Sequence, residues 1–327
     1  MKNFFNIFIV SFALVFSTSS FANKIGVIYD SGGKFDKSFN ELAYNTAMRV
    51  VNELGWDLIE FEAANGTQIE QGMRKVADRG ATLIVAMGFA QADAVAAIAP
   101  QYPDINFVAV DVCWVDDPAG NIYQACYLEH EGSFLVGMIA AMASKTGKVG
   151  FVGGMDIPLI RKFQGGYEQG AKYANPDIEV FSNMTGTTPE AWNNPTKGAE
   201  LTKAQIDKGA DVVYQAAGGT GIGVLQAAAD AGIYGIGVDT NQNWMHPGTM
   251  LTSMLKRLDL TIFEQAEKTA AGTFEPSGKF LSLGLAEGMV GYATEDGQVT
   301  AEMQSAVDAA AAEIISGAIT VADWSQE

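Results

Sequence analysis

Histidine is scarce in this chain, and the common motifs of enzyme chemistry are missing. The histidines are His130 and His246, and neither has metal-ligand spacing to a second histidine. The sequence contains no GxSxG nucleophile elbow, no GxxxxGKS/T phosphate loop and no HExxH pair. These absences count against an enzyme and favour a protein that binds its ligand without transforming it.

Positive charge is in the minority. The sequence has 20 Lys and Arg residues against 38 Asp and Glu residues, which gives a formal net charge of −18 at pH 7. A chain this acidic repels phosphate backbones and anionic lipids, so nucleic acid and membrane surfaces are excluded as expected partners. The acidic residues are spread along the chain, which indicates solubility rather than a particular substrate.

Long hydrophobic runs are absent beyond residues 4–17, FFNIFIVSFALVFS. That run follows Lys2, is short for a membrane span, and precedes small residues at Ser20 and Ala22. This combination is typical of a secretory signal peptide. We therefore expect a signal peptide over residues 1–22, cleavage after Ala22, and an exported, soluble protein without a lipid anchor.

Cysteine is nearly absent, since the chain contains Cys113 and Cys126 alone. In an oxidising compartment these two residues can form a disulfide that joins neighbouring segments. Two separate buried thiols fit the sequence equally well, because pairing geometry cannot be read from spacing. Both alternatives stay open at this point.

Short apolar runs alternate with amphipathic helical segments, which is typical of a doubly wound α/β protein with parallel sheets. In the first half we expect strands near 25–30, 57–63, 82–88 and 106–111, with helices near 39–54, 67–79 and 89–99. The pattern then restarts, with helices near 131–145, 160–174, 197–208 and 220–231, and strands near 148–154, 178–183, 210–218 and 234–239. Chain length and this restart together predict two domains.

The two series resemble copies of one another. RGATLIVAMG (79–88) aligns with KGADVVYQAAG (208–218), and NFVAVD aligns with YGIGVD. Ligands of open α/β sheets bind beyond the carboxyl ends of the strands. Two facing lobes would thus bring Asp30, Asp111 and Asp239 to one cleft, where they can accept hydrogen bonds from a ligand, cap helices or form a metal cluster.

The tail from 249 to 327 is too short for a third lobe. Helices expected at about 257–271 and 300–316 would join the existing lobes, so the chain should cross between lobes repeatedly and form a multi-strand hinge. The predicted first lobe contains residues 23–127 and about 251–284. The predicted second lobe contains residues 128–250 and about 285–327.

Glycine-rich turns follow strands at SGGKFDKSFN (31–40) and at AAGGTGIG (216–223). Neither has the GxGxxG spacing of a dinucleotide-binding loop. The second turn is instead expected to present backbone N–H groups to the cleft.

The end of the first turn fits a helix cap. Ser38 and Glu41 match the capping-box pattern, and Asp36 is a competing cap. Capping alone would leave Phe39 as a core residue and would not explain Asp30 at the end of the strand. Contact of this turn with a ligand is the alternative.

The turn and several later stretches resemble the basic membrane protein family, the solute-binding components of certain ABC transporters, some of which are purine nucleoside receptors. The resemblance covers essentially the whole chain after residue 22. It is carried by YDSGGKFDKSFNELAY (29–44), AMGF (86–89), VAVD (108–111), LEHEGSFLVGMIAAMASKTGKVGFVGGMDIP (128–158), FQGGYEQGAKY (163–173), NNPTKGAELTKAQIDKGADVVYQAAGGTGIGV (193–224), IGVD (236–239) and LTSMLKR (251–257). It implies a type I periplasmic-binding-protein fold, in which two Rossmann-like lobes close on a ligand.

The resemblance also implies roles for individual residues. Phe39 would stack on a base and Asn40 would bind its edge. The implied polar anchors are Asp30, Asp111, Asp239 and Lys256, of which Asp239 and Lys256 would bind ribose hydroxyls. Met87, Gly88 and Phe89 would line one wall, and Gly218 and Gly219 would offer backbone contacts.

A second aromatic ring is not evident in the strand VVYQAAGG, which ends in alanines. Trp192 is the first candidate for that ring, and Trp114 and Phe163 are the others. The alternative for each of them is a residue that covers the edge of a core, and for Trp192 a place at the cleft is favoured.

The function implied is that of a monomeric periplasmic solute-binding protein, which takes no cofactor and delivers a small ligand to an ABC transporter permease. A purine nucleoside is the expected ligand. The alternatives are a free nucleobase, a flavin or a sugar, an exported sensor, and a secreted nucleoside hydrolase with an aspartate cluster on a metal.

Overall fold

The computed structural model describes residues 22–63 and 66–326. The expected signal peptide lies outside these residues apart from Ala22. Across the described ranges, no helix combines the length and the hydrophobicity needed to cross a bilayer.

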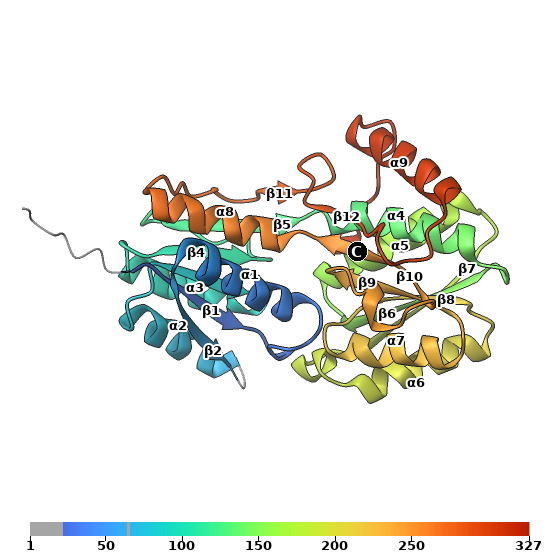
Figure 1. The fold of residues 1–327 in the computed structure, drawn as a ribbon, viewed down its shortest axis with the longest axis horizontal. Coiled ribbons are helices and arrows are strands. Elements are labelled where there is room, and N and C mark those ends of the chain that lie inside the picture. Colours follow the sequence, from blue (N-terminus) through green and yellow to red (C-terminus); the bar gives the residue numbers. More distant parts are fainter. Residues whose placement is uncertain (1–21, 64–65, 327) are drawn as a thin grey trace, which may run out of the picture.

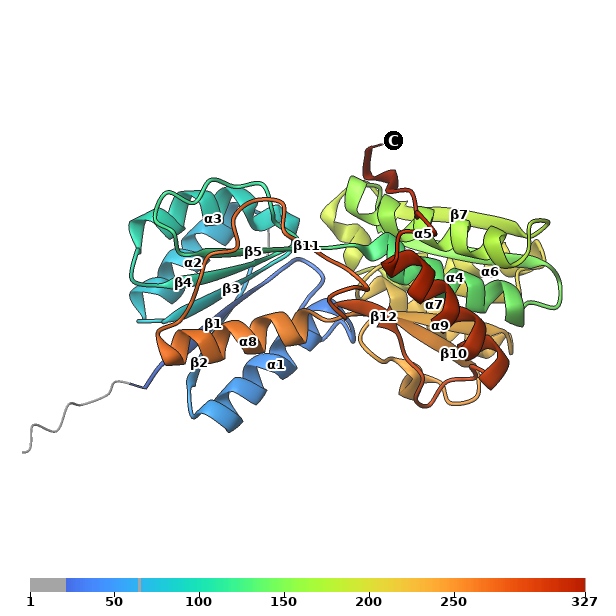
Figure 2. The ribbon, with the colours of Figure 1, turned by 90° about the horizontal axis from the view of Figure 1, so that it is seen from above.

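The first lobe is built on a parallel sheet with the strand order β11-β5-β4-β3-β1-β2 (Figure 1). Its strands are β1 (Lys24–Tyr29), β2 (Asp57–Glu62), β3 (Leu83–Met87), β4 (Asn106–Val110), β5 (Ile122–Tyr127) and β11 (Ser282–Leu283). Helices α1 (Phe39–Leu54) and α8 (Leu258–Ala271) cover one face, and α2 (Ile69–Asp78) and α3 (Ala92–Ile98) cover the other (Figure 2).

The second lobe repeats this plan with the strand order β12-β10-β9-β8-β6-β7, in which β12 runs antiparallel to β10. Its strands are β6 (Lys148–Met155), β7 (Glu179–Gly186), β8 (Val212–Ala216), β9 (Tyr234–Asp239), β10 (Met250–Lys256) and β12 (Val290–Tyr292). Its helices are α4 (Glu129–Ala143), α5 (Pro158–Ala174), α6 (Pro195–Asp207), α7 (Thr220–Asp230) and α9 (Ala301–Ile315). Short 3-10 turns are η1 (Gly66–Gln68), η2 (Phe89–Gln91), η3 (Ala99–Gln101), η4 (Pro189–Trp192), η5 (Asn243–Met245) and η6 (Trp324–Gln326).

The alternation of side chains along β1 explains why both faces of the sheet are covered. Val27 and Tyr29 join the core beneath α1, while Ile28 between them joins the core beneath α2. All three side chains are fully buried. Continuous apolar strands of this kind are typical of parallel sheets with helices on both faces, and the predicted α/β fold is confirmed.

The expected crossings between lobes are also found. Within the described residues the chain crosses three times: from β5 into α4, from β10 into α8, and from β11 to β12. The second crossing comes later than expected, because β10 pairs with β9 in the second sheet and the return to the first lobe begins only after Lys256. The strand β5 was not anticipated, since polar and apolar residues mix in its sequence IYQACY.

Candidate functional site

A pocket lies between the lobes, at the carboxyl ends of strands from both sheets. Asp30 and Asp111 follow β1 and β4, while Asp239 and Lys256 end β9 and β10. The pocket contains about 540 Å³ of unfilled space, part of it open to solvent.

Most of the residues predicted to bind a ligand meet in this pocket. Those in its lining are Asp30, Phe39, Gly88, Phe89, Asp111, Trp192, Gly218, Asp239 and Lys256. Asn40, Met87 and Gly219 lie outside the lining; Asn40 and Met87 are fully buried. The lining also contains Gly32, Asp36, Leu159, Ile160, Phe163, Ala216, Ala217 and Val238.

Several of the unanticipated lining residues carry a positional signal. Leu159 and Ile160 occupy the first turn of α5, shortly after β6, and Ala216 ends β8 with Ala217 directly after it. The rule that ligands bind beyond the carboxyl ends of strands would have included them. Their small or aliphatic side chains carry no chemistry that would mark them otherwise.

Asp36 caps α1 and fixes the turn that carries Phe39. Its carboxylate accepts hydrogen bonds from the backbone N–H groups of Ser38, Asn40 and Glu41, at 2.9, 3.0 and 3.1 Å. The alternative capping box is wrong, because Ser38 makes no side-chain cap hydrogen bond. Asp36 therefore frees the Ser38 hydroxyl for another contact.

Asn40 supports Asp30 from behind. Its Nδ2 donates to Asp30 Oδ1 at 2.5 Å and to the Gly33 carbonyl at 3.2 Å, while its Oδ1 accepts from the Asp30 N–H at 3.2 Å. This arrangement orients one carboxylate of the pocket. It also engages both ends of the Asn40 amide, which accounts for its absence from the lining.

Asp111 and Asp239 occupy equivalent places in the two lobes. Both end their strands in the left-handed region, with φ of 60° and 66°. Non-glycine residues rarely adopt this conformation, although Asp and Asn tolerate it better than others. The shared backbone geometry matches the sequence repeat of VAVD and IGVD, and it turns both carboxylates into the pocket.

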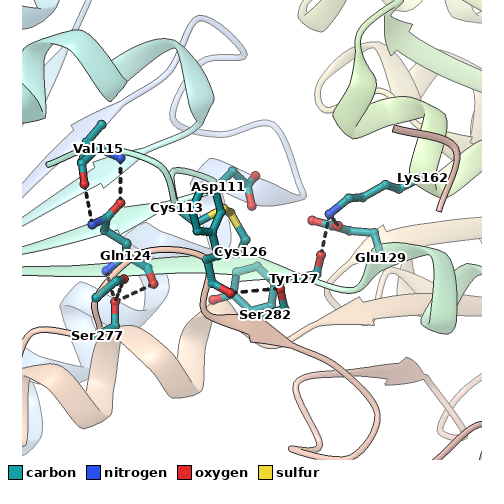
Figure 3. The surroundings of a disulfide bond; sticks show 12 residues. Asp111, Cys113, Val115, Gln124, Cys126, Tyr127, Glu129, Lys162, Ser277 and Ser282 are labelled. Carbon is teal, nitrogen blue, oxygen red and sulfur yellow. Dashed lines mark hydrogen bonds and ion pairs between the residues drawn. A yellow bond between two sulfur atoms is a disulfide. The ribbon is translucent and has the colours of Figure 1, made fainter. Parts of the chain in front are cut away.

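A disulfide joins Cys113 to Cys126, with the two Cα atoms 5.7 Å apart (Figure 3). Of the two alternatives left by the sequence, the bonded one is found. The Asp111 N–H donates to the Ala125 carbonyl at 2.8 Å, and the Gln124 amide bonds both backbone groups of Val115. The loop after Asp111 is thus attached to β5 covalently and by hydrogen bonds.

Lys256 is a buried ammonium group where the lobes meet. Its Nζ lies 2.6 Å from Asp111 Oδ1 and 3.0 Å from an oxygen of Glu129, and its exposed fraction is 1%. Rings surround it as well, with the centroids of Tyr127, Phe39 and Phe163 at 5.0, 5.3 and 5.8 Å. Glu129 was not singled out by the sequence, because its neighbours in LEHEGS read as an ordinary helix start.

Burial and charge shift the pKa values of this cluster. Burial alone would lower the pKa of Lys256, but the charges of Asp111, Glu129 and Asp239 outweigh it and raise the pKa. Burial raises the pKa of Asp111 to about 6 against the opposing charge of Lys256. Lys256 therefore stays positively charged, while Asp111 can change its protonation state near neutral pH.

The other carboxyl groups of the pocket respond mainly to burial. It raises the pKa of Asp30, of Asp239, and of Asp36, the last to about 8. Hydrogen-bond donors oppose the shift in each case, from Asn40 to Asp30 and from Ser38 to Asp239. The pocket thus holds more acidic groups than Lys256 can neutralise, and it suits a ligand rich in hydrogen-bond donors.

Phe39, Phe89, Phe163 and Trp192 provide the aromatic part of the lining. The ring of Trp192 lies over the backbone of Gly154, where an added Cβ would come within 2.2 Å of it. Trp114, the remaining candidate for a second ring, is 47% exposed and lies outside the lining. The rings come from both lobes, since Phe39 begins α1 and Phe163 belongs to α5.

The lobes also touch one another directly. The hydroxyl of Ser38 donates to the carboxylate of Asp239 and lies 3.4 Å from the Val238 carbonyl. The Gln242 side chain donates to the Lys37 carbonyl at 2.8 Å. These contacts define a closed arrangement of the cleft.

The comparisons with known proteins agree with this geometry. A family model described as "ABC transporter substrate-binding protein PnrA-like" matches residues 22–325. Basic membrane protein A2 of Borrelia garinii subsp. bavariensis is 33% identical over 304 residues, which cover 91% of this chain and 88% of that protein. ABC transporter nucleoside-binding protein BmpA of Lactococcus lactis subsp. cremoris is 32% identical over 320 residues, with 91% and 88% covered.

A solved structure shows the same fold. An ABC transporter system solute-binding protein from Aeropyrum pernix superposes with a TM-score of 0.81 at 28% identity, covering 92% of this chain and 93% of that one. The lobes and crossings described above are therefore those of a type I periplasmic binding protein.

Proposed function

Because the chain belongs to the family of PnrA-like ABC transporter substrate-binding proteins, we propose that it captures a purine nucleoside between its lobes and delivers it to an ABC permease. On this proposal the protein loses residues 1–22 on export and works as a monomer in the periplasm. The observation that carries the proposal is the pocket itself, which combines aromatic rings with buried carboxylates. A nucleoside offers a flat base to the rings and hydroxyl donors to the carboxylates.

Aromatic stacking supplies the first part of the recognition. Phe39 with Phe163 or Trp192 can flank a planar ring that enters from the open side of the pocket. Stacking of one base on an aromatic side chain contributes about 1–3 kcal/mol. A purine presents more flat surface to these rings than a pyrimidine, which favours it as the base.

The carboxylates supply the second part. Asp111 and Asp239 can each accept from hydroxyl groups, and hydrogen bonds to ionised acceptors are strong in a closed, dry cleft. The same charges repel a phosphate, so the free nucleoside is favoured over the nucleotide. A relative that is 32% identical carries the words "nucleoside-binding" in its name, which supports this ligand class.

Closure of the lobes completes the mechanism. Asp111 and Phe39 belong to the first lobe, whereas Asp239 and Trp192 belong to the second. A ligand that touches both lobes stabilises the closed arrangement over an open one, and the segments that cross between lobes act as the hinge.

Hydrolysis is disfavoured as the alternative use of the cleft. A metal ion in this cleft would need carboxylate ligands. The Lys256 ammonium group already occupies the position between the Asp111 and Glu129 carboxylates. In the part of the chain that the structure describes, no group of three or more His, Cys, Asp or Glu side chains is arranged to hold a metal ion. We therefore propose binding without turnover.

Calorimetric titration tests the ligand class. The purified mature protein is titrated with inosine, guanosine and adenosine, and with guanine, ribose, riboflavin and guanosine 5′-monophosphate as comparators. We expect the purine nucleosides to bind at least tenfold more tightly than each comparator. Equal or tighter binding of a comparator would replace the nucleoside by that ligand class.

Chromatography of the same mixtures after overnight incubation tests the absence of turnover. We expect the nucleoside to be recovered intact. Release of the free base by the wild-type protein, and its loss in Asp239→Asn, would contradict the proposal in favour of a hydrolase.

A further inference from the structure

Glu129 is a buried carboxylate that lies behind the pocket lining. It begins α4 and its side chain is fully buried. Lys256 Nζ lies 3.0 Å from one of its oxygens, and Lys162 Nζ lies 3.4 Å from the other. Burying a carboxylate costs free energy that only good partners offset. The two lysines provide that compensation for Glu129.

The cluster around Glu129 balances its own charge. Asp111 and Glu129 contribute two negative charges, and Lys256 and Lys162 contribute two positive charges. Lys162 Nζ also donates to the Tyr127 carbonyl at 3.1 Å (Figure 3). This bond attaches the cluster to the end of β5, where the chain leaves the first lobe.

The members of the cluster belong to different lobes. Asp111 follows β4 in the first lobe, whereas Glu129 begins α4 and Lys256 ends β10, which pack together in the second. Separation of the lobes would therefore move Asp111 away from Lys256 but leave Glu129 beside it. Without Glu129, Lys256 would lose both of its ion pairs on opening and would keep only the charge of Asp239 in the same lobe.

We propose that Glu129 is a positioning residue, which holds the Lys256 ammonium group toward the cleft while the lobes are open. Closure then adds Asp111 and the ligand as further partners of an ammonium group that is already in place. Lys162 holds Glu129 in turn, by its own ion pair and through its bond to Tyr127. The effect on ligand affinity rests on the proposed function, because it requires Lys256 to contact the nucleoside.

The experiment compares Glu129→Gln with Glu131→Gln. Glu131 lies two residues further along α4, is half-buried and accepts from the Leu285 N–H at 2.8 Å, so it is a matched control that does not contact Lys256. Guanosine affinity is measured by calorimetry. In the ligand-free protein, the side-chain ammonium signal of Lys256 is recorded by NMR after ¹⁵N-lysine labelling and assigned with Lys256→Met.

We expect Glu129→Gln to weaken guanosine binding at least tenfold and to broaden or abolish the Lys256 ammonium signal. Glu131→Gln should retain both. An unchanged affinity and an unchanged signal in a folded Glu129→Gln protein would overturn the proposal. If Glu129→Gln does not fold, Lys162→Gln replaces it. We expect this variant to lose about threefold in guanosine affinity and to broaden the Lys256 ammonium signal. Unchanged affinity together with an unchanged signal would overturn the proposal.

Failure of the nucleoside assignment gives a different result. In that case the wild-type protein itself does not bind guanosine, while the ammonium signal still reports on Lys256. Loss of that signal in Glu129→Gln, but not in Glu131→Gln, would support the positioning role even then. Retention of the signal in Glu129→Gln would refute the role.

Discussion

The hydroxyl of Ser38 in the first lobe donates a hydrogen bond to the carboxylate of Asp239 in the second, across 201 positions of sequence. This bond connects the turn before α1 directly to the end of β9. Gln242 strengthens the same junction through the Lys37 carbonyl. Hydrogen bonds between the lobes therefore contribute to the stability of the closed cleft.

Removal of the Ser38 hydroxyl should shift the lobes toward opening. A hydrogen bond of this kind contributes about 1 kcal/mol net, so Ser38→Ala should weaken guanosine binding roughly fivefold. Small-angle scattering of the ligand-free variant should give a larger radius of gyration than wild type. Ser316→Ala, directly after α9, is the control, because the Ser316 hydroxyl donates to the Glu313 carbonyl away from the cleft. Wild-type values for both quantities in Ser38→Ala would show that the bond does not govern closure.

Phe39 and Asp239 should each be required for binding, and neither for folding. Phe39→Ala removes a stacking ring, which contributes about 1–3 kcal/mol, and Asp239→Asn removes a charged acceptor. Asn is chosen because Asp239 has a φ of 66°, where Ala would be strained. Calorimetry should show at least tenfold weaker guanosine binding in each variant. The thermal midpoint of the ligand-free protein should stay close to wild type. Full affinity in both variants would refute the site.

Gly154 should be needed for the position of the Trp192 ring. A Cβ at Gly154 would come within 2.2 Å of that ring, so Gly154→Ala should displace the ring and weaken guanosine binding at least tenfold. Quenching of tryptophan fluorescence by guanosine should diminish in parallel. Gly291→Ala is the matched control, since Gly291 also lies in a strand and an added Cβ there meets no atom within 4 Å. Equal binding by the two variants would exclude Trp192 from recognition.

Ligand affinity should fall at acidic pH because of Asp111. Burial raises the pKa of Asp111 to about 6, and the ionised form is the better acceptor for hydroxyl groups. Guanosine affinity should therefore fall roughly tenfold between pH 7 and pH 5. Asp111→Asn should bind weakly at both pH values, with a smaller change between them than wild type shows. His130→Gln is the control and should keep the wild-type slope.

The raised pKa of Asp111 has the opposite effect on the stability of the ligand-free protein: it favours the folded state at acidic pH, where ligand binding is weakest. The folded chain binds the Asp111 proton more tightly than the unfolded chain does. Its contribution to the free energy of unfolding is thus fully present below about pH 4 and is lost as the pH rises through about 6. Denaturant titrations from pH 5 to pH 7 should show a smaller decline in Asp111→Asn than in wild type. Parallel declines would assign the titration to another group.

The disulfide should matter for both stability and binding. A cross-link that closes a loop of about 15 residues contributes roughly 3 kcal/mol through the unfolded chain. The double variant Cys113→Ser, Cys126→Ser should lose about this much free energy of unfolding and should also bind guanosine more weakly, because the loop after Asp111 is freed from β5. Treatment of the wild-type protein with a reductant should reproduce both changes. A loss of stability with full affinity would limit the disulfide to a structural role.

Much of the fold was readable from the sequence because central strands such as β1, β3, β4 and β9 are short, mainly apolar runs. The aspartates at the ends of β1, β4 and β9 predicted where the pocket would lie. The placement of β10 was not predictable in the same way. Its sequence MLTSMLK fits either sheet. The choice depends on pairing with β9 and with β12, and the three residues of β12 carry little strand signal.

The details of the site depend on contacts that local sequence does not reveal. Ser38 has the pattern of a cap, but Asp36 provides the cap and Ser38 bonds across the cleft. Asn40 has the chemistry of a base-edge partner, but its amide is engaged by Asp30 and Gly33. Glu129 has no local signature at all, because its partner Lys256 lies 127 positions away in the chain.

The repeated crossing of the chain between the lobes makes each lobe depend on the tail of the chain. Each sheet takes an edge strand from the tail, β11 in the first lobe and β12 in the second, and α8 returns to cover β-strands formed some 150 residues earlier. A gene fragment that ended after β9 would leave both lobes incomplete. Although the two lobes resemble duplicated halves, each is completed by residues of the tail, so neither lobe consists of one continuous half of the chain.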